Sequence, residues 1–100
     1  MYRLVATYKK PNDIDAFMEH YRTSHAVKTN KLPKLKGYSW GRTEMPDGSE
    51  PADFLVAVVD FENKDDFLAA MGSPEGAEAN GDLELMPHNG FTMQAYEFES

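Results

Sequence analysis

The sequence predicts a small α+β domain whose elements follow the order βαββαβ. Three observations carry this prediction: alternating side chains near both ends of the chain, a strongly β-prone run near its middle, and helical periodicity in the stretches between. With 100 residues the chain has room for one domain, 1–100, because domains usually span about 100–150 residues. Hydrophobic residues make up 41% of the chain, which is typical of globular proteins rather than disordered ones, so we expect it to fold.

The first half of the chain is expected to form a strand, a helix and a second strand. Residues 2–9 alternate in side-chain type, which predicts a strand. Asp13 is a favourable N-cap residue, and we expect a helix from there to Thr29. At about 100° per residue its apolar residues form one stripe. The stripe contains Ile14, Phe17, Met18, Tyr21 and His25.

The second half supplies the remaining elements. The segment 37–43 alternates large and small side chains, and residues 53–61 form the most β-prone run; the turn-rich segment between them predicts a hairpin. A helix capped by Asn63 is expected to end at Gly72, and Ser73 and Pro74 begin a short helix to residue 85. Residues 91–98 alternate again and predict the last strand. This order is that of the ferredoxin-like fold, a four-stranded antiparallel sheet with helices on one face.

The sheet is expected to need a second copy of the chain. The third strand is apolar on both faces, with Phe54, Val56 and Val58 on one of them. Helices on one side leave the opposite face in water, and monomers rarely expose large apolar patches. We therefore predict a two-fold homodimer with the sheets packed face to face and a natural pocket between them.

Composition excludes several classes of partner and chemistry. The chain has 17 acidic and 10 basic residues, a formal charge of −7, so we expect neither nucleic acid nor an anionic membrane as a partner. It lacks an apolar run long enough to span a bilayer and a signal-peptide pattern, and we expect it to be cytoplasmic. Without cysteine there is no disulfide, thiolate nucleophile or Cys-ligated zinc.

His25 is the candidate catalytic residue. It lies at the end of the apolar stripe, where burial would keep the imidazole neutral and suited to proton transfer. The alternative is a structural histidine that satisfies the last carbonyls of its helix. His20 and His25 would diverge by about 140° on an α-helix, so they predict no metal site, and His20 is expected to face solvent. His88, in a Pro-Asn-Gly loop, is expected to be exposed, with no role assigned.

Aromatic residues predict a ligand pocket near His25. Three residues of the second predicted strand share one face, and with suitable strand alignment the first strand adds a tyrosine. Such a cluster would line a site for a small hydrophobic or aromatic molecule, with Arg42 holding an anionic or carbonyl group. Plain packing remains the alternative. No phosphate loop, nucleophile elbow or nicotinamide fingerprint occurs, so we expect no cofactor. The candidate substrate-binding residues are Tyr8, Tyr21, Tyr38, Trp40 and Arg42.

The segment from Phe17 to Val27, followed by residues 32–38, resembles the EthD-like family, named for a gene cluster that degrades ethyl tert-butyl ether. The shared pattern is Tyr-Arg, a short gap and His, then Leu-Pro, a leucine, Gly and Tyr; Ser73-Pro74-Glu75-Gly76 matches a further family segment. The resemblance implies a dimeric α+β barrel and places the family's recurrent histidine at His25. Its wider superfamily includes cofactor-free oxygenases, isomerases and haem-dependent proteins, so fold alone does not choose the reaction.

Three functions therefore remain open from the sequence. The first is a small catabolic or tailoring enzyme of the cofactor-free oxygenase, isomerase or dehydratase type, with His25 as proton shuttle. The second is a non-catalytic module that binds or carries a ligand for a degradation pathway. The third is haem binding through a histidine.

Overall fold

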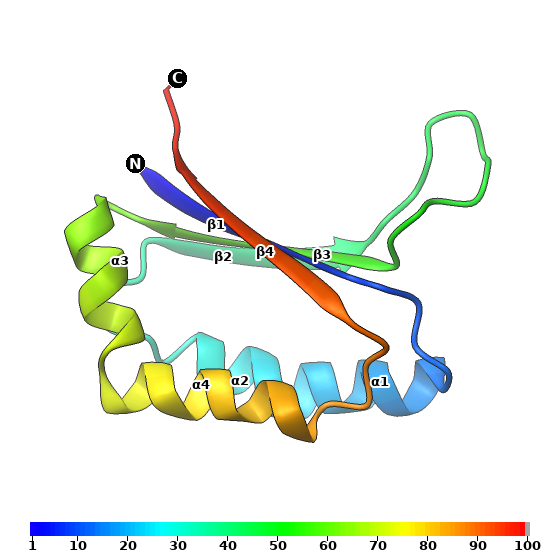
Figure 1. Cartoon of the computed structure of the whole chain (residues 1–100), viewed down its shortest axis with the longest axis horizontal. Coiled ribbons are helices and arrows are strands. Elements are labelled where there is room, and N and C mark those ends of the chain that lie inside the picture. The colour runs from blue at the N-terminus through cyan, green and yellow to red at the C-terminus, as the bar shows by residue number, and fades with distance from the viewer. Residues whose placement is uncertain (100) are drawn as a thin grey trace.

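The computed structural model describes residues 1–99 and shows a four-stranded antiparallel sheet with helices below it (Figure 1). The order within the sheet is β2-β3-β1-β4, so the first and third strands are central. The prediction of a ferredoxin-like βαββαβ fold is confirmed. The strands are β1 (Tyr2–Tyr8), β2 (Gly37–Arg42), β3 (Leu55–Phe61) and β4 (Phe91–Glu97).

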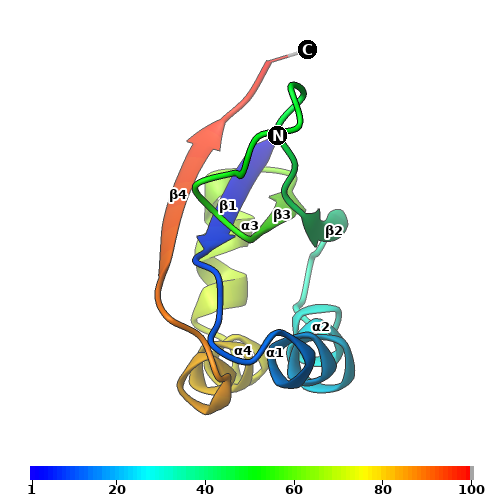
Figure 2. The ribbon, with the colours of Figure 1, turned by 90° about the vertical axis from the view of Figure 1, so that its right-hand side faces the viewer.

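The first predicted helix forms as one continuous helical stretch with an unexpected turn inside it. Helix α1 (Ile14–His20) continues through a π-helical turn (Tyr21–His25) into α2 (Ala26–Thr29). Asp13 caps it, because its side chain accepts a hydrogen bond from the Ala16 amide. The stretch lies beside α4 beneath the sheet (Figure 2).

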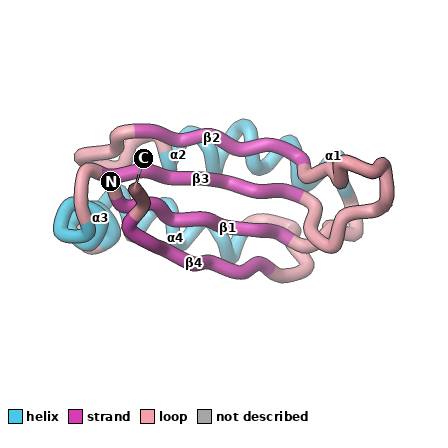
Figure 3. Tube along the Cα trace, turned by 90° about the horizontal axis from the view of Figure 1, so that it is seen from above, coloured by secondary structure: helices cyan, strands magenta, loops and turns pink. Residues whose placement is uncertain are grey.

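The second helical region contains two helices, α3 (Lys64–Met71) and α4 (Pro74–Leu85), as predicted. Asn63 and Ser73 are their N-caps, accepting from the amides of Asp66 and Gly76. Seen from above, α3 stands at one end of the sheet while α4 crosses under it (Figure 3). No helix within residues 1–99 is long and apolar enough to cross a membrane.

The helix-facing side of the sheet follows the predicted alternation. On β1, Ala6 and Tyr8 are buried toward the helices, and Tyr8 pairs in register with Leu55 on one side and Phe91 on the other. The prediction for Phe54 is wrong: it precedes β3 and packs its ring against Phe17, 5.8 Å away, instead of joining the outer face. The apolar part of the outer face is therefore smaller than the sequence indicated.

Two glycines of α4 separate the effect of close backbone packing on the stability of the protein from the effect of helix propensity. A methyl group on Gly76 would overlap the carbonyl oxygens of Ala70 and Met71, whereas nothing lies within 4 Å of a methyl group on Gly81. We predict that Gly76→Ala lowers the free energy of unfolding by about 2 kcal/mol or more, because the backbone must shift. Gly81→Ala is the matched control and should raise it by about 0.5–1 kcal/mol. Urea denaturation measures both, and equal effects would contradict the packing argument.

Candidate functional site

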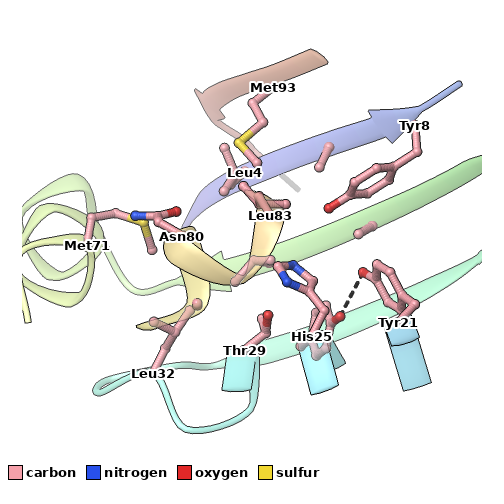
Figure 4. A pocket seen from close by; sticks show the side chains of 15 residues that line it. Leu4, Tyr8, Tyr21, His25, Thr29, Leu32, Met71, Asn80, Leu83 and Met93 are labelled. Atoms are coloured by element: carbon pink, nitrogen blue, oxygen red, sulfur yellow. Dashed lines mark hydrogen bonds between the residues drawn. The ribbon is translucent and has the colours of Figure 1, made fainter. Parts of the chain in front are cut away.

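A cavity lies between the helix-facing side of the sheet and the helices, and His25 stands in its wall (Figure 4). It has about 40 Å³ of free volume, which gives room for a few water molecules or for the reacting end of a larger molecule. Met93 and Asn80, both exposed, form part of the wall, so the cavity reaches the surface between β4 and α4. The other lining residues are Leu4, Ala6, Tyr8, Tyr21, Thr29, Leu32, Tyr38, Ala57, Val59, Met71, Ala79 and Leu83.

Behind His25 lies a buried carboxylate that the sequence did not single out. Asp82 of α4 has no exposed side-chain surface, and four side chains of the facing helical stretch donate to it. Ser24 Oγ and Lys28 Nζ lie 2.7 and 3.0 Å from Oδ1. Burial opposes ionisation, but hydrogen bonds from Ser24, Lys28 and His20 outweigh it and hold the pKa of Asp82 at about 2. The carboxylate is thus charged at neutral pH.

The π-helical turn explains why both helix histidines reach Asp82. The amide of Ala26 donates to the carbonyl of Tyr21, five residues back, which places residues five apart about one turn above one another. His20 Nε2 lies 3.1 Å from both Asp82 oxygens, and His25 Nδ1 lies 3.1 Å from Oδ2. The expected 140° divergence and a solvent-facing His20 were therefore wrong, because they assumed a regular α-helix.

The contact with Asp82 fixes which nitrogen of His25 carries its proton. A carboxylate only accepts hydrogen bonds, so Nδ1 is the donor and Nε2 keeps its lone pair. No hydrogen bond from residues 1–99 engages Nε2, and the ring borders the cavity. Burial lowers the pKa of His25 below 6.5, an effect larger than the opposing one of the Asp82 hydrogen bond. His25 is therefore a neutral base at pH 7.

Three tyrosines bring hydroxyl groups to the same cavity. Tyr21 Oη and Tyr38 Oη are 2.8 Å apart and share a hydrogen bond, while the Tyr8 ring packs edge-on against Tyr21. Burial raises the pKa of all three phenols above the ordinary value of 10.0. They are therefore neutral at pH 7 and able to donate hydrogen bonds.

The other two predicted binding residues do not line the cavity. Trp40 packs against Tyr21, with ring centroids 4.8 Å apart, and supports that tyrosine from outside the cavity wall. Arg42 is exposed at the end of β2, where its guanidinium lies 4.6 Å from the Phe54 ring centroid and borders a separate polar hollow. Strand alternation correctly predicts that these residues of β2 share one face of the strand. It does not show how far the cavity extends along β2, and the cavity ends before Arg42.

Neither a metal ion nor haem suits this arrangement. Among residues 1–99 no group of three or more His, Cys, Asp or Glu side chains is arranged to hold a metal ion. The Lys28 ammonium and the Ser24 hydroxyl also occupy the Asp82 oxygen that a cation would need. A haem group needs a pocket of several hundred Å³, far more than the 40 Å³ beside His25. The haem hypothesis therefore does not fit the residues present.

Comparisons with known proteins support the resemblance seen in the sequence. No protein-family model matches the chain. An uncharacterized 11.0 kDa protein of the thcB–thcC intergenic region of Rhodococcus erythropolis is 34% identical over 93 residues, covering 93% of this chain and 90% of that protein. The crystal structure of an ethyl tert-butyl ether degradation (EthD) family protein from Bacillus halodurans has a TM-score of 0.91 at 29% identity, covering 99% of each chain.

More distant structures share the fold. A cofactor-independent oxygenase from Streptomyces nogalater has a TM-score of 0.72 at 12% identity, covering 99% of this chain and 93% of its own. A dimeric ferredoxin-like protein of unknown function from Thermobifida fusca has a TM-score of 0.73 at 18% identity, covering 97% of this chain and 90% of that protein.

The charges around Asp82 predict two losses of stability as the pH falls. Folding lowers the pKa of His25, so the unfolded chain binds a proton at a higher pH than the folded chain. The contribution of His25 to the free energy of unfolding is therefore complete above pH 6.5 and is lost as the pH falls below that value. The pKa of Asp82 falls from 3.8 to about 2, so a further loss of about 2 kcal/mol is expected between about pH 4 and pH 2.

Denaturant titrations at a series of pH values measure both losses. His25→Gln should reduce the change in the free energy of unfolding near pH 6. His88→Gln, which alters a histidine outside the Asp82 cluster, should leave that change as large as in the wild type. A drop near pH 6 that persists in the His25 variant would contradict the assignment.

Proposed function

The chain belongs to the EthD family, and we propose that it is an enzyme that moves a proton on a small oxygenated organic molecule held in the cavity. The observation that carries this proposal is the contact between Asp82 Oδ2 and His25 Nδ1, with Nε2 left free beside an apolar cavity. This arrangement orients a neutral base and supplies a negative charge that stabilises it after proton uptake.

The chemistry follows from the groups around the ligand. Nε2 of His25 takes a proton from a carbon next to a carbonyl, or from a hydroxyl, and becomes an imidazolium paired with Asp82. Neutral tyrosine hydroxyls then stabilise the oxyanion that develops on the ligand, and apolar walls strengthen these hydrogen bonds. Return of the proton to another atom completes an isomerisation or assists loss of water.

The electron-rich ligand can instead react with dioxygen, which is the course of a cofactor-free oxygenation. The fold shared with a cofactor-independent oxygenase supports keeping this reaction within the proposal. All three outcomes begin with the same proton abstraction by His25, so one test addresses them together.

Proton abstraction is tested by deuterium incorporation from D₂O into small ketones and phenols, followed by mass spectrometry. The protein should accelerate exchange by about 100-fold or more over buffer, a usual contribution from a placed base. The rate should rise with pH to a plateau, with a midpoint below 6.5, because His25 must be neutral. His25→Gln should remove the acceleration.

Asp82→Asn should also lower the exchange rate by at least about tenfold, because an amide can donate to Nδ1 and select the wrong tautomer. His88→Gln is the control and should exchange like the wild type. Ligand-induced shifts in melting temperature without any acceleration would refute the catalytic role and favour the alternative, a ligand-binding accessory protein.

The proposal includes a homodimer formed through the outer face of the sheet. No helix within residues 1–99 covers this face (Figure 2). Val5 and Val58 pair at its centre and Val56 lies beside them, all only partly buried in one chain. Several proteins of the same fold are described as dimeric, which supports the pairing. A second sheet would remove these valines from water.

Light scattering tests the dimer and should give about twice the chain mass of 11.3 kDa. Val58→Lys places a charge at the centre of the outer face and should yield a folded monomer, because a buried unpaired ammonium strongly destabilises an interface. Lys64→Ala, an exposed change at the start of α3, is the control. A wild-type chain that remains monomeric at micromolar concentration would contradict the dimer.

A further inference from the structure

We infer that the cavity recognises its ligand through an uncharged oxygen atom that accepts a hydrogen bond from Tyr8 Oη, so that small carbonyl compounds and phenols bind and carboxylates do not. This inference deepens the proposed function, because it rests on the cavity as the ligand site. It does not depend on His25 acting as a base.

The first observation is a buried hydroxyl aimed into the cavity. Tyr8 is 1% exposed, and its oxygen points toward the space in front of His25 (Figure 4). Within residues 1–99, Tyr21 and Tyr38 bond to each other, and no protein group bonds to the Tyr8 oxygen. Because every fully buried polar side-chain atom of the described residues has a hydrogen-bond partner, the unbonded Tyr8 oxygen is open to the cavity, where it can donate to a ligand oxygen. The hydroxyl therefore indicates a ligand contact.

The second observation is that the Tyr8 hydroxyl is held in place. Tyr8 sits in a central strand, paired with Leu55 and Phe91, and its carbonyl accepts a bond from the Phe54 amide. The ring is packed against three others, with centroids 5.7 Å away for Phe17, 5.8 Å for Tyr21 and 5.7 Å for Phe91. A donor fixed in this way loses little conformational entropy when a ligand accepts a hydrogen bond from it.

The third observation concerns charge. None of the described residues that line the cavity is a lysine or arginine. The nearby Lys28 ammonium is tied to Asp82, whose own negative charge lies directly behind His25. A carboxylate ligand would lose its hydration without gaining a counter-ion, which is costly, whereas a carbonyl or phenol oxygen needs only a donor. The lining thus selects neutral oxygen compounds.

Phenol and toluene are suitable probes because they have similar shapes and differ by a hydroxyl in place of a methyl group. Binding is measured by titrating each into the ¹⁵N-labelled protein and following amide shifts of the cavity residues. The wild type should bind phenol about tenfold more tightly than toluene. Tyr8→Phe should bring this ratio several-fold closer to one while leaving the toluene affinity unchanged. Benzoate should bind more weakly than phenol.

Tyr2→Phe is the matched control, because Tyr2 lies on the same strand and face but packs against Phe67, away from the cavity. It should leave the ratio near ten. The inference is overturned if the Tyr8 variant loses affinity for both probes equally, if phenol shows no preference in the wild type, if benzoate binds best, or if no probe binds. His25→Gln should still distinguish phenol from toluene, so failure of proton transfer is recognised separately.

Discussion

The buried carboxylate of Asp82 is the interaction on which the helical layer and the candidate site both depend. Burying an ion costs several kcal/mol unless other groups satisfy it, and here Ser24, Lys28 and two histidines do so from the facing helix. These contacts fix both the position of α4 along the α1–α2 stretch and its rotation about its own axis. The same contact sets the tautomer of His25, so helix packing and base orientation have a common cause.

The π-helical turn is the second constraint, and it is linked to the first. One extra residue in the turn brings His20 and His25 to the same side, where a regular α-helix would separate them. The hydrogen bonds to Asp82 stabilise this irregular backbone. The π-helical turn also places His25 at the cavity wall. Tyr21 begins the same turn, so its hydroxyl is placed by the same backbone feature.

Most of the fold could be predicted from local signals. Alternation marked the strands, and the caps Asp13, Asn63 and Ser73 marked helix starts that the structure shows. The site was harder, because its key contact joins residues 57 positions apart, and α4 carried only a weak helical pattern. The local sequence shows no pattern that predicts the π-helical turn. An aspartate in a weakly amphipathic helix gives no sign of burial until the facing helix is in place.

The charge balance of the site indicates what it can stabilise. At neutral pH the Asp82 carboxylate and the Lys28 ammonium offset one another, His25 is neutral and the phenols are protonated. A ligand that arrives already charged finds no free counter-charge. A charge that forms inside the cavity is different, because an imidazolium at His25 meets Asp82 and an oxyanion meets fixed hydroxyl donors. Such a site favours the separated charges of a proton transfer over either charge alone, which is the charge distribution that the proposed reaction requires.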